Sequence, residues 1–435
     1  MPVPTRRLAA VAAFAAVVVL LAPTPAGWTI VVVEVVLLGL AVGDALFGAP
    51  PDRMDVEREL PGVLPLEGEG EVVWRVRNPS ARRATVWIAD ELAPSLRATS
   101  RRARLSIPAN GRATSTARLR PSRRGRFTPT ELTVRVEGPL GLGARQRRRQ
   151  LAGVLRVYPP FKSRQEAELR IDRARILEVG LRSARGQGGG TDFDALREYA
   201  VDDETRRIDW AATARTTKVI VRTYRAERNQ TMLLLLDTGR TMAGQVDGVP
   251  RLDHALDAVM MLTAVATRLG DSAGLVAFDE SVRAIVGPGH ARGQLGRVTE
   301  AMYTLEPRLV ESNYRGAFGQ TLARFRRRAL LVLLTDLSEA PVQESLLPAL
   351  PLVARDHLVV VAGIRDPQVD AWAAAVPANA GETYRKAAAV EALDARRRTV
   401  ARLRGLGATV VDAPPGRLAP QLADAYLHLK ATGRL

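Results

Sequence analysis

The C-terminal half of the chain alternates apolar strands with helical stretches, and this alternation restricts the possible folds more than any other feature. The apolar runs read TMLLLLD, SAGLVAFD, RALLVLLTD, HLVVVAGI and GATVVDA. A strand with apolar residues at successive positions buries both of its faces, which requires helices on both sides of a parallel sheet. We therefore predict a doubly wound α/β domain over residues 231–435, in which GLVAFDESVRAIVG forms a hairpin at one side of the sheet.

One helical stretch of this region has a clear apolar face. The residues on that face are Leu252, Leu256, Val259, Met260, Thr263, Ala266 and Leu269. Gly270 follows them directly and is predicted to end the helix.

Two of the predicted strands end on an acidic residue. Asp237 ends TMLLLLD and is followed by the hydroxyl of Thr241, Asp336 ends RALLVLLTD, and Ser312 lies between them in ESNYRGAF. Parallel sheets place ligand sites at the carboxyl ends of their strands, and carboxylates and hydroxyls are oxygen ligands of the kind that Mg²⁺ uses. Asp237 is therefore either a metal ligand or only the cap of the helix that follows it.

Two apolar segments open the chain. Residues 8–22 and the segment WTIVVVEVVLLGLAVGDALFG from Trp28 are joined by PTPAG. Each is short for the roughly 20 residues of a membrane span, and slight extension or local thinning of the bilayer accommodates this. Residues 1–50 are therefore predicted to form a transmembrane helical hairpin, although a signal peptide would share the basic start and the apolar core.

Charged residues near these segments predict the topology. Arg6 and Arg7 precede the first segment, and Arg53 and Arg58 follow the second. Because basic flanks face the cytoplasm, we expect a multi-pass protein of the cell membrane whose soluble domains are cytoplasmic. Glu34 lies within the second segment, where it is protonated, faces a partner helix or is merely tolerated.

Residues 51–160 consist of short runs with period-two alternation. The runs read EVVWRVRN, ATVWIAD, RARLSIP, STARLRP, TELTVRVEG and VLRVYPP, with turn sequences such as NPS, PANG and SRRG between them. This pattern is typical of a β-sandwich of immunoglobulin-like type. Residues 161–230 read as a polar connector, with a helical stretch near 164–180 and a glycine-rich piece at 186–190.

The net charge of +17 is concentrated before the connector, since residues 51–160 hold 22 arginines and 11 acidic residues. A basic face toward anionic lipid headgroups explains this excess. We do not expect nucleic-acid binding, because the chain has no zinc-finger spacing, RNP-like aromatic motif or basic heptad zipper. The chain also contains no cysteine, no HExxH spacing and no GxxxxGK[ST] loop, which argues against a zinc enzyme and against nucleotide hydrolysis by a P-loop.

The segment upstream of Asp237 carries a series of motifs in a fixed order. They are REY at Arg197–Tyr199, a D-x-x-R-x-I-D-W from Asp203 to Trp210, an A-x-A-R from Ala212 to Arg215, and ER at Glu227–Arg228. Together with PSRRGRF at 121–127 and GPLGLG at 138–143, these motifs resemble the bacterial family called domain of unknown function 58. The resemblance covers nearly the whole chain. For Asp209 and Trp210 we expect a structural clamp, in which the Trp packs against the sheet and the Asp holds backbone N–H groups, rather than direct contact with a partner.

The acids and hydroxyls farther along resemble the von Willebrand factor A domain, which carries D-x-S-x-S, then a Thr, then an Asp. The positions that match are Asp237, Thr241, Ser312 and Asp336. The resemblance implies a site for a divalent cation, Mg²⁺ or Mn²⁺, built from these oxygens. Gly239 stands where the family has its first Ser, so one hydroxyl ligand is missing and we expect weak binding.

The resemblance to domain of unknown function 58 also implies a partner, because proteins of that family look like companions of MoxR-type AAA+ ATPases. We therefore expect a membrane-anchored adaptor or scaffold, not an enzyme, that binds protein partners through a degenerate metal-ion-dependent site in the assembly or maturation of protein complexes. Two alternatives stay open. One is a metal-dependent hydrolase that uses Asp237 and Asp336, for which two carboxylates are few. The other is a basic scaffold for nucleic acid or cell-wall polymer, which would bind DNA in a salt-dependent manner.

Overall fold

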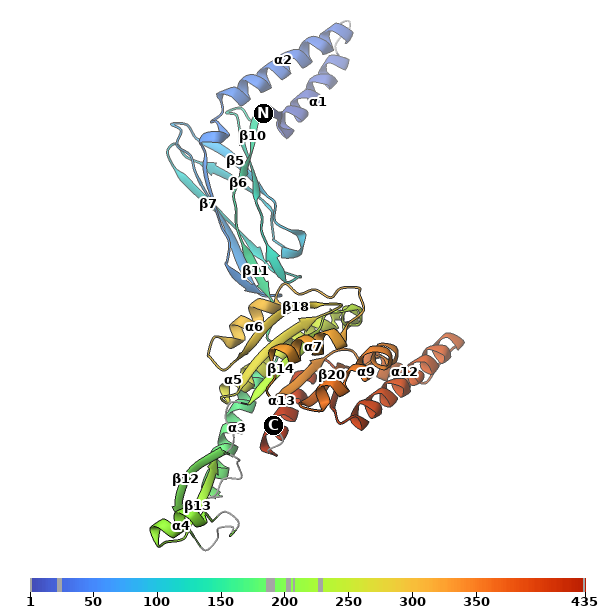
Figure 1. Ribbon diagram of the computed structural model, residues 1–435. Helices are drawn as coiled ribbons and strands as arrows, with labels where there is room; N and C mark the ends of the chain where they lie inside the picture. Colours follow the sequence, from blue (N-terminus) through green and yellow to red (C-terminus); the bar gives the residue numbers. More distant parts are fainter. Residues whose placement is uncertain are drawn as a thin grey trace. The chain divides into compact units, whose positions relative to one another are not determined.

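The chain forms two compact units, Met1–Pro160 and Phe161–Leu435 (Figure 1). The structure, a computed structural model, describes residues 2–21, 26–184, 192–200, 205, 208–225, 230–432 and 435. Several sequence predictions fall outside the described residues. These are most of the PTPAG turn, the glycine-rich piece at 186–190, part of the segment from Asp203 to Trp210, and the Glu227–Arg228 pair.

The first unit is built mainly from strands that form three sheets, of order β1-β10-β9-β5-β6, β2-β4-β7 and β3-β11-β8. The strands are β1 Pro2–Pro4, β2 Asp55–Glu59, β3 Val63–Pro65, β4 Gly70–Arg77, β5 Ala84–Asp90, β6 Arg102–Ile107, β7 Arg112–Leu119, β8 Gly125–Phe127, β9 Glu131–Glu137, β10 Gly143–Gln150 and β11 Leu155–Tyr158. Of two 3₁₀ turns, η1 Pro51–Arg53 precedes β2 and η2 Pro94–Leu96 lies between β5 and β6. All six runs that were predicted as strands from their alternation are strands, which confirms that prediction.

The inward faces of these strands share one hydrophobic core. Val72, Trp74 and Val76 are buried on β4 and alternate with more exposed neighbours, as the period of two in a strand requires. The Trp74 indole N–H donates to Asp90 at 2.7 Å, and Arg58 donates to the other oxygen of the same carboxylate at 2.6 Å. The core thus contains a buried ion pair that is hydrogen-bonded on both sides.

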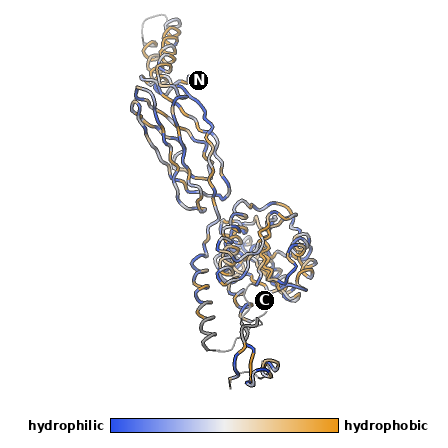
Figure 2. The backbone as a smooth tube through the Cα atoms, turned by 60° about the vertical axis from the view of Figure 1, so that its left-hand side comes forward, coloured by the Kyte–Doolittle hydropathy of each residue, from blue (hydrophilic) through white to orange (hydrophobic). Residues whose placement is uncertain are grey.

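Two apolar helices precede this core, α1 Arg6–Leu21 and α2 Ala26–Phe47. They lie against each other, and Figure 2 shows their strongly apolar character. Among the described residues one helix, Gly27–Arg53, is long and apolar enough to cross a membrane. The 16 residues of α1 rise only about 24 Å, which is short of the ~30 Å hydrocarbon core. The structure thus supports one candidate span rather than the two that were predicted.

The base of α2 is fixed to the loop before β10. The Asp44 carboxylate accepts the backbone N–H groups of Leu140, Leu142 and Gly143 at 2.7, 2.8 and 3.0 Å. A Cβ at Gly143 would lie 1.9 Å from the Ala41 carbonyl oxygen, so the close approach of the helix requires glycine there. Strand β1, which precedes α1, pairs with β10 itself. Both ends of the α1–α2 pair are therefore attached to the same strand and its preceding loop.

The second unit contains a six-stranded sheet of order β18-β17-β14-β19-β20-β21. Its strands are β14 Thr231–Asp237, β17 Ser272–Phe278, β18 Val282–Gly289, β19 Leu330–Leu334, β20 Leu358–Ile364 and β21 Thr409–Ala413, and β15 Gln245–Val246 and β16 Val249–Pro250 form a separate small pair. All neighbours in the large sheet are parallel except β17 and β18, which form an antiparallel hairpin at its edge. The predicted parallel sheet and its lateral hairpin are confirmed.

Helices cover both faces of this sheet. They are α5 Arg251–Arg268, α6 Gln294–Met302, α7 Tyr314–Arg324, α8 Glu339–Pro341, α9 Leu347–Ala349, α10 Pro351–Ala354, α11 Pro367–Ala374, α12 Ala380–Gly405 and α13 Leu418–Ala431, with η4 Arg240–Ala243 and η5 Val342–Leu346. The residues Leu233–Leu236 alternate between two cores, one shared with α5 and α13 and the other with α7 and α10. In α5, Leu252 and Leu256 of the predicted apolar face are buried, and Gly270 adopts a φ of +83° just beyond the helix.

The predicted connector is more structured than expected. It contains α3 Arg164–Ala184, the antiparallel strands β12 Asp192–Glu198 and β13 Ile220–Arg225, and the short helix α4 Trp210–Thr216. Helix α3 confirms the helical stretch that was predicted near 164–180, and it packs against α5 and α13. Strand β13 lies between the A-x-A-R motif and the Glu227–Arg228 pair, where the family resemblance implies a strand, whereas β12 was not predicted.

Candidate functional site

Charged residues gather at the carboxyl edge of the large sheet. Asp237 ends β14, Asp279 follows β17, Asp336 follows β19, and Arg365 follows β20. The chain runs from β14 to one side of the sheet and returns on its other side at β19. Asp237 and Asp336 therefore flank the point where the strand order reverses, which is where open α/β sheets bind ligands.

Asp237 is completely buried, and four donors surround its carboxylate. The Ser312 hydroxyl and the Gly239 N–H donate to Oδ1 at 2.5 and 2.8 Å. The hydroxyls of Thr335 and Tyr314 donate to Oδ2 at 2.7 and 3.1 Å. Ser312 was predicted for this site, whereas Thr335 and Tyr314 were not. The cluster joins the ends of β14 and β19 to the start of α7.

Protonation in this cluster is set mainly by burial. Burial raises the pKa of Asp237, and the hydrogen bonds from Ser312, Thr335, Gly239 and Tyr314 oppose that rise. Burial, followed by the charge of Asp237, raises the pKa of Tyr314 well above its ordinary value. The phenol therefore stays protonated and serves as a donor.

Asp237 does not cap the helix that follows it, so that alternative is wrong. The helical turn η4 has Gly239 at its N-cap position, with no capping bond from a side chain. A Cβ at Gly239 would lie 2.1 Å from the Ser312 hydroxyl and 3.1 Å from the Asp237 carboxylate. Glycine at this position therefore allows Ser312 to approach Asp237, which gives a physical reason for the departure from the family's Ser.

Asp336 is also almost fully buried, and two arginines neutralise it. Arg396 Nη1 lies 3.3 Å and Arg251 Nε 3.6 Å from Oδ1, while the Ser338 hydroxyl donates to Oδ2. Arg396 also binds Asp412 at 2.9 Å. Burial alone would lower the pKa of Arg396, but its hydrogen bond to Asp412 and the charges of Asp336 and Asp412 more than compensate and raise it. Neither arginine was predicted from the sequence.

The surroundings of the predicted cation ligands both favour and oppose an ion. The Thr241 hydroxyl is buried without a hydrogen-bond partner among the described residues, as a ligand without its ion would be. Arg251 and Arg396 act against a cation, because a divalent ion at Asp336 would lie beside two positive groups. No group of three or more His, Asp or Glu side chains in the described parts of the chain could hold a metal ion. The predicted oxygens fit a cation only after the two guanidiniums have moved.

The Asp209–Trp210 prediction is half correct. The Asp209 carboxylate accepts the N–H groups of Ala211 and Ala212, both at 3.0 Å, and binds Arg222 at 2.8 Å. The hydrogen bond from Arg222 is the main cause that lowers the pKa of Asp209. Trp210, however, is 70% exposed, so its predicted packing against the sheet is wrong. The local chain holds the Asp but leaves the indole in solvent.

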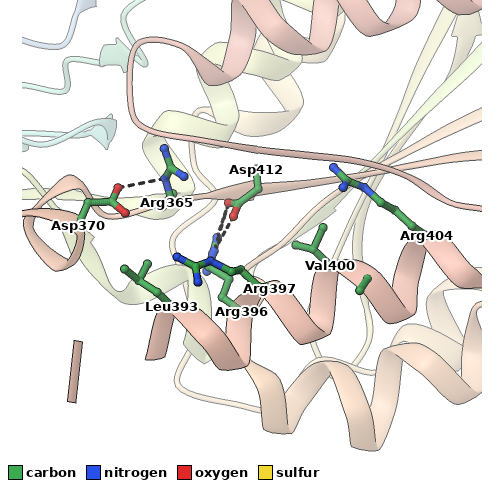
Figure 3. A pocket seen from close by; sticks show the side chains of 9 residues that line it. Arg365, Asp370, Leu393, Arg396, Arg397, Val400, Arg404 and Asp412 are labelled. Atoms are coloured by element: carbon green, nitrogen blue, oxygen red, sulfur yellow. Dashed lines mark hydrogen bonds and ion pairs between the residues drawn. The ribbon is translucent and has the colours of Figure 1, made fainter. Parts of the chain in front are cut away.

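A cavity of about 300 Å³ lies beside Arg396, between α12 and the ends of β20 and β21 (Figure 3). Six charged residues line it, namely Arg365, Arg396, Arg397, Arg404, Asp370 and Asp412. Arg365 binds Asp370 at 3.1 Å, and Arg396 binds Asp412 as described above. No motif in the sequence marks this set, because three of its members lie on α12 and the other three lie on or beside β20, α11 and β21.

The chain therefore combines a β-rich unit that carries apolar N-terminal helices with an α/β unit whose parallel sheet bears buried acids and hydroxyls at its carboxyl edge. Residues 195–382 match the family described as Protein of unknown function DUF58. The resemblance to domain of unknown function 58 is thereby confirmed over these residues.

Solved structures are similar to parts of the chain at low sequence identity. The conserved hypothetical protein BatB from Bacteroides thetaiotaomicron is 13% identical, with a TM-score of 0.32, over 47% of this chain and 100% of that one. A protein of unknown function from Porphyromonas gingivalis W83 is 21% identical, with a TM-score of 0.19, over 25% of this chain and 48% of that one. No curated protein matches the sequence. At these TM-scores the similarities support no inference.

Proposed function

We propose that the protein is a membrane-anchored adaptor, not an enzyme, which binds protein partners at the carboxyl edge of its parallel sheet. The Asp237 cluster is the main support. A buried carboxylate at the reversal of strand order is held by four donors, and the hydroxyls of Ser312, Thr335 and Tyr314 are all engaged in holding it. Such an arrangement suits a preformed recognition surface. In this proposal the second unit is von Willebrand factor A-like and the first is immunoglobulin-like.

We further propose that this edge is a degenerate metal-ion-dependent site. Mg²⁺ or Mn²⁺ would be held weakly by Asp237, Thr241, Ser312 and Asp336. When bound, the ion supplies an open coordination position for a carboxylate of the partner, so that ion and partner bind cooperatively. Without the ion, the guanidiniums beside Asp336 provide positive charge at the same edge.

The partner we propose is a MoxR-type AAA+ ATPase, acting in the assembly or maturation of protein complexes. The match to this family supports this choice. The test is to purify the tagged full-length protein in detergent, with ATP present, and to identify co-purifying proteins by mass spectrometry. We expect a AAA+ ATPase in wild-type samples and less of it with Asp237→Asn, once circular dichroism has shown that the variant is folded. Absence of any AAA+ ATPase from wild-type samples would refute the partnership.

We also propose that α1 and α2 enter the bilayer together, with both ends and all soluble parts in the cytoplasm. The attachment of β1 and of Asp44 to β10 and its preceding loop supports this, because it holds both ends of the helix pair together. The chain contains no cysteine, so a single introduced thiol can be labelled specifically. Val376→Cys, at a position 89% exposed, should resist a membrane-impermeant reagent in intact cells and react after lysis. Reaction in intact cells would place the second unit outside.

A further inference from the structure

The cavity beside α12 carries more positive than negative charge. Four guanidinium groups and two carboxylates line it, and Figure 3 shows them together with the apolar side chains of Leu393 and Val400. Two of the guanidiniums are already engaged, since Arg396 binds Asp412 and Arg365 binds Asp370. The charge available to a ligand therefore lies on the other two arginines.

Arg397 and Arg404 are both accessible from solvent. The Arg397 side chain is 77% exposed and pairs with Asp394, which is also partly exposed, at 2.7 Å. Exposed pairs of this kind contribute little free energy, so an incoming anion can replace Asp394. The Arg404 side chain has no ion-pair or hydrogen-bond partner among the residues that the structure describes. Both arginines can therefore turn to a ligand at small cost.

The spacing of these arginines indicates the kind of anion. Arg397 and Arg404 are seven residues apart on α12, which corresponds to about 10 Å along the helix. Guanidinium groups bind carboxylates and phosphates bidentately, but one phosphate cannot bridge that distance. Two anionic groups on one chain can. Val400, which lies between the two arginines in the sequence and lines the same cavity, suits the aliphatic part of an acidic side chain.

We infer that this cavity binds an acidic segment of a partner protein, through Arg397 and Arg404. Its volume is at the lower end of the range for ligand sites, which suits a few side chains rather than a cofactor. Single-stranded nucleic acid is disfavoured, because such sites stack bases on aromatic side chains and no aromatic residue lines this cavity. The inference rests on the proposed adaptor function and adds to it the chemistry of the segment that is recognised.

The test uses the full-length protein in detergent and a fluorescein-labelled decapeptide rich in glutamate, with binding followed by fluorescence anisotropy. We expect Arg397→Glu combined with Arg404→Glu to weaken binding at least tenfold. Arg402→Glu is the matched control, since Arg402 is exposed in the last turn of the same helix but does not line the cavity, and it should change affinity less than twofold. Asp370→Asn should tighten binding several-fold, because it frees Arg365.

Any of four results would overturn the inference. The first is unchanged binding in the double variant, with circular dichroism showing that the variant is folded. The second is equal affinity for a decapeptide in which glutamine replaces glutamate. The third is tighter binding of inorganic phosphate or of a DNA oligonucleotide through the same two arginines. Recovery of the AAA+ ATPase by wild-type protein that fails to bind the acidic peptide would overturn the acidic-segment site while leaving the adaptor proposal intact.

Discussion

The guanidinium of Arg396 lies 3.3 Å from the carboxylate of Asp336 and therefore joins α12 to the carboxyl end of β19. The same guanidinium binds Asp412 on β21 at 2.9 Å and donates to the Ile364 carbonyl at the end of β20. One side chain thus holds three neighbouring strand ends. Because the side chains of Asp336 and Asp412 are largely buried, the arginine also neutralises charge that water cannot fully solvate.

Arg396→Met should therefore destabilise the protein strongly. Removing one partner from a buried ion pair leaves uncompensated charge and typically costs about 3–5 kcal/mol. Arg398→Met is the control, because Arg398 lies two residues away on α12 and makes only a half-exposed pair with Glu339 at 3.6 Å. It should change the free energy of unfolding by less than about 0.5 kcal/mol. Urea unfolding of both variants is the measurement, and equal effects would show that Arg396 makes no special contribution.

Asp237→Asn should have an effect on stability that depends on pH. Burial raises the pKa of Asp237 in the folded protein above its value in the unfolded chain. As pH rises from the unfolded pKa toward the folded one, the unfolded state loses its proton first, so this group contributes progressively less stability. Asparagine does not titrate, and the neighbouring hydroxyls can rotate to donate or accept. The loss caused by Asp237→Asn should therefore be larger at pH 4 than at pH 7 in urea unfolding. A loss that grows toward pH 7 would contradict a raised pKa.

The sequence predicted elements whose hydrophobic pattern is regular. The four leucines of β14 and the alternating residues of β4 each bury the positions that their pattern indicates. Strand β10, by contrast, reads GARQRRRQ and was not predicted. Its sequence has no alternation of apolar and polar residues that would mark it as a strand. Most of its arginines instead make polar contacts, for example Arg149 with the backbone carbonyls of Pro51 and Asp52.

Only part of the candidate site was predicted from the sequence. Asp237, Ser312 and Asp336 follow from the order of strands and from the family resemblance. Arg396 could not be found in this way, because it lies 60 residues beyond Asp336 on a helix whose sequence reads as a solvated, charged surface. Tyr314 begins α7, and no motif in the sequence marked its hydroxyl as a partner of Asp237.

Gly143→Ala should separate α2 from the β-rich unit. A Cβ at this position would lie 1.9 Å from the Ala41 carbonyl oxygen, and neither backbone segment can move without breaking the contacts of Asp44. Loss of these three hydrogen bonds would cost about 1–3 kcal/mol or more. Limited proteolysis near residues 138–143 should therefore accelerate. Gly62→Ala is the control, since a Cβ there has no neighbour within 4 Å. Equal protease resistance in both variants would contradict the tight contact.

Gly239 and Ser312 should be coupled in a double-mutant cycle. Gly239→Ala forces its Cβ against the Ser312 hydroxyl, 2.1 Å away in the present arrangement, and overpacking of this kind costs about 1–3 kcal/mol. In a Ser312→Ala background the hydroxyl is absent, so the same substitution should cost less. The difference measured by urea unfolding is the coupling energy. Additive effects would show that Ser312 does not approach Gly239 as described.

Binding of Mn²⁺ should be controlled by the arginines beside Asp336. In the wild type, Arg251 and Arg396 compete with an ion for this carboxylate, so isothermal calorimetry should show weak binding at most. Arg251→Gln removes a positive charge that lies 3.6 Å from the Asp336 carboxylate. A guanidinium this close to the carboxylate repels a divalent ion bound there by several times 1.4 kcal/mol, on the order of the Coulomb energy of near-surface charges. The substitution should therefore tighten Mn²⁺ binding at least tenfold, or about 1.4 kcal/mol. Arg251 is the better position to change, since Arg396 also holds Asp412. Adding Asp237→Asn to Arg251→Gln should abolish the gain if Asp237 is a ligand. If neither wild type nor Arg251→Gln produces heat, the predicted cation is absent, and the positive charge at this edge comes from the arginines alone.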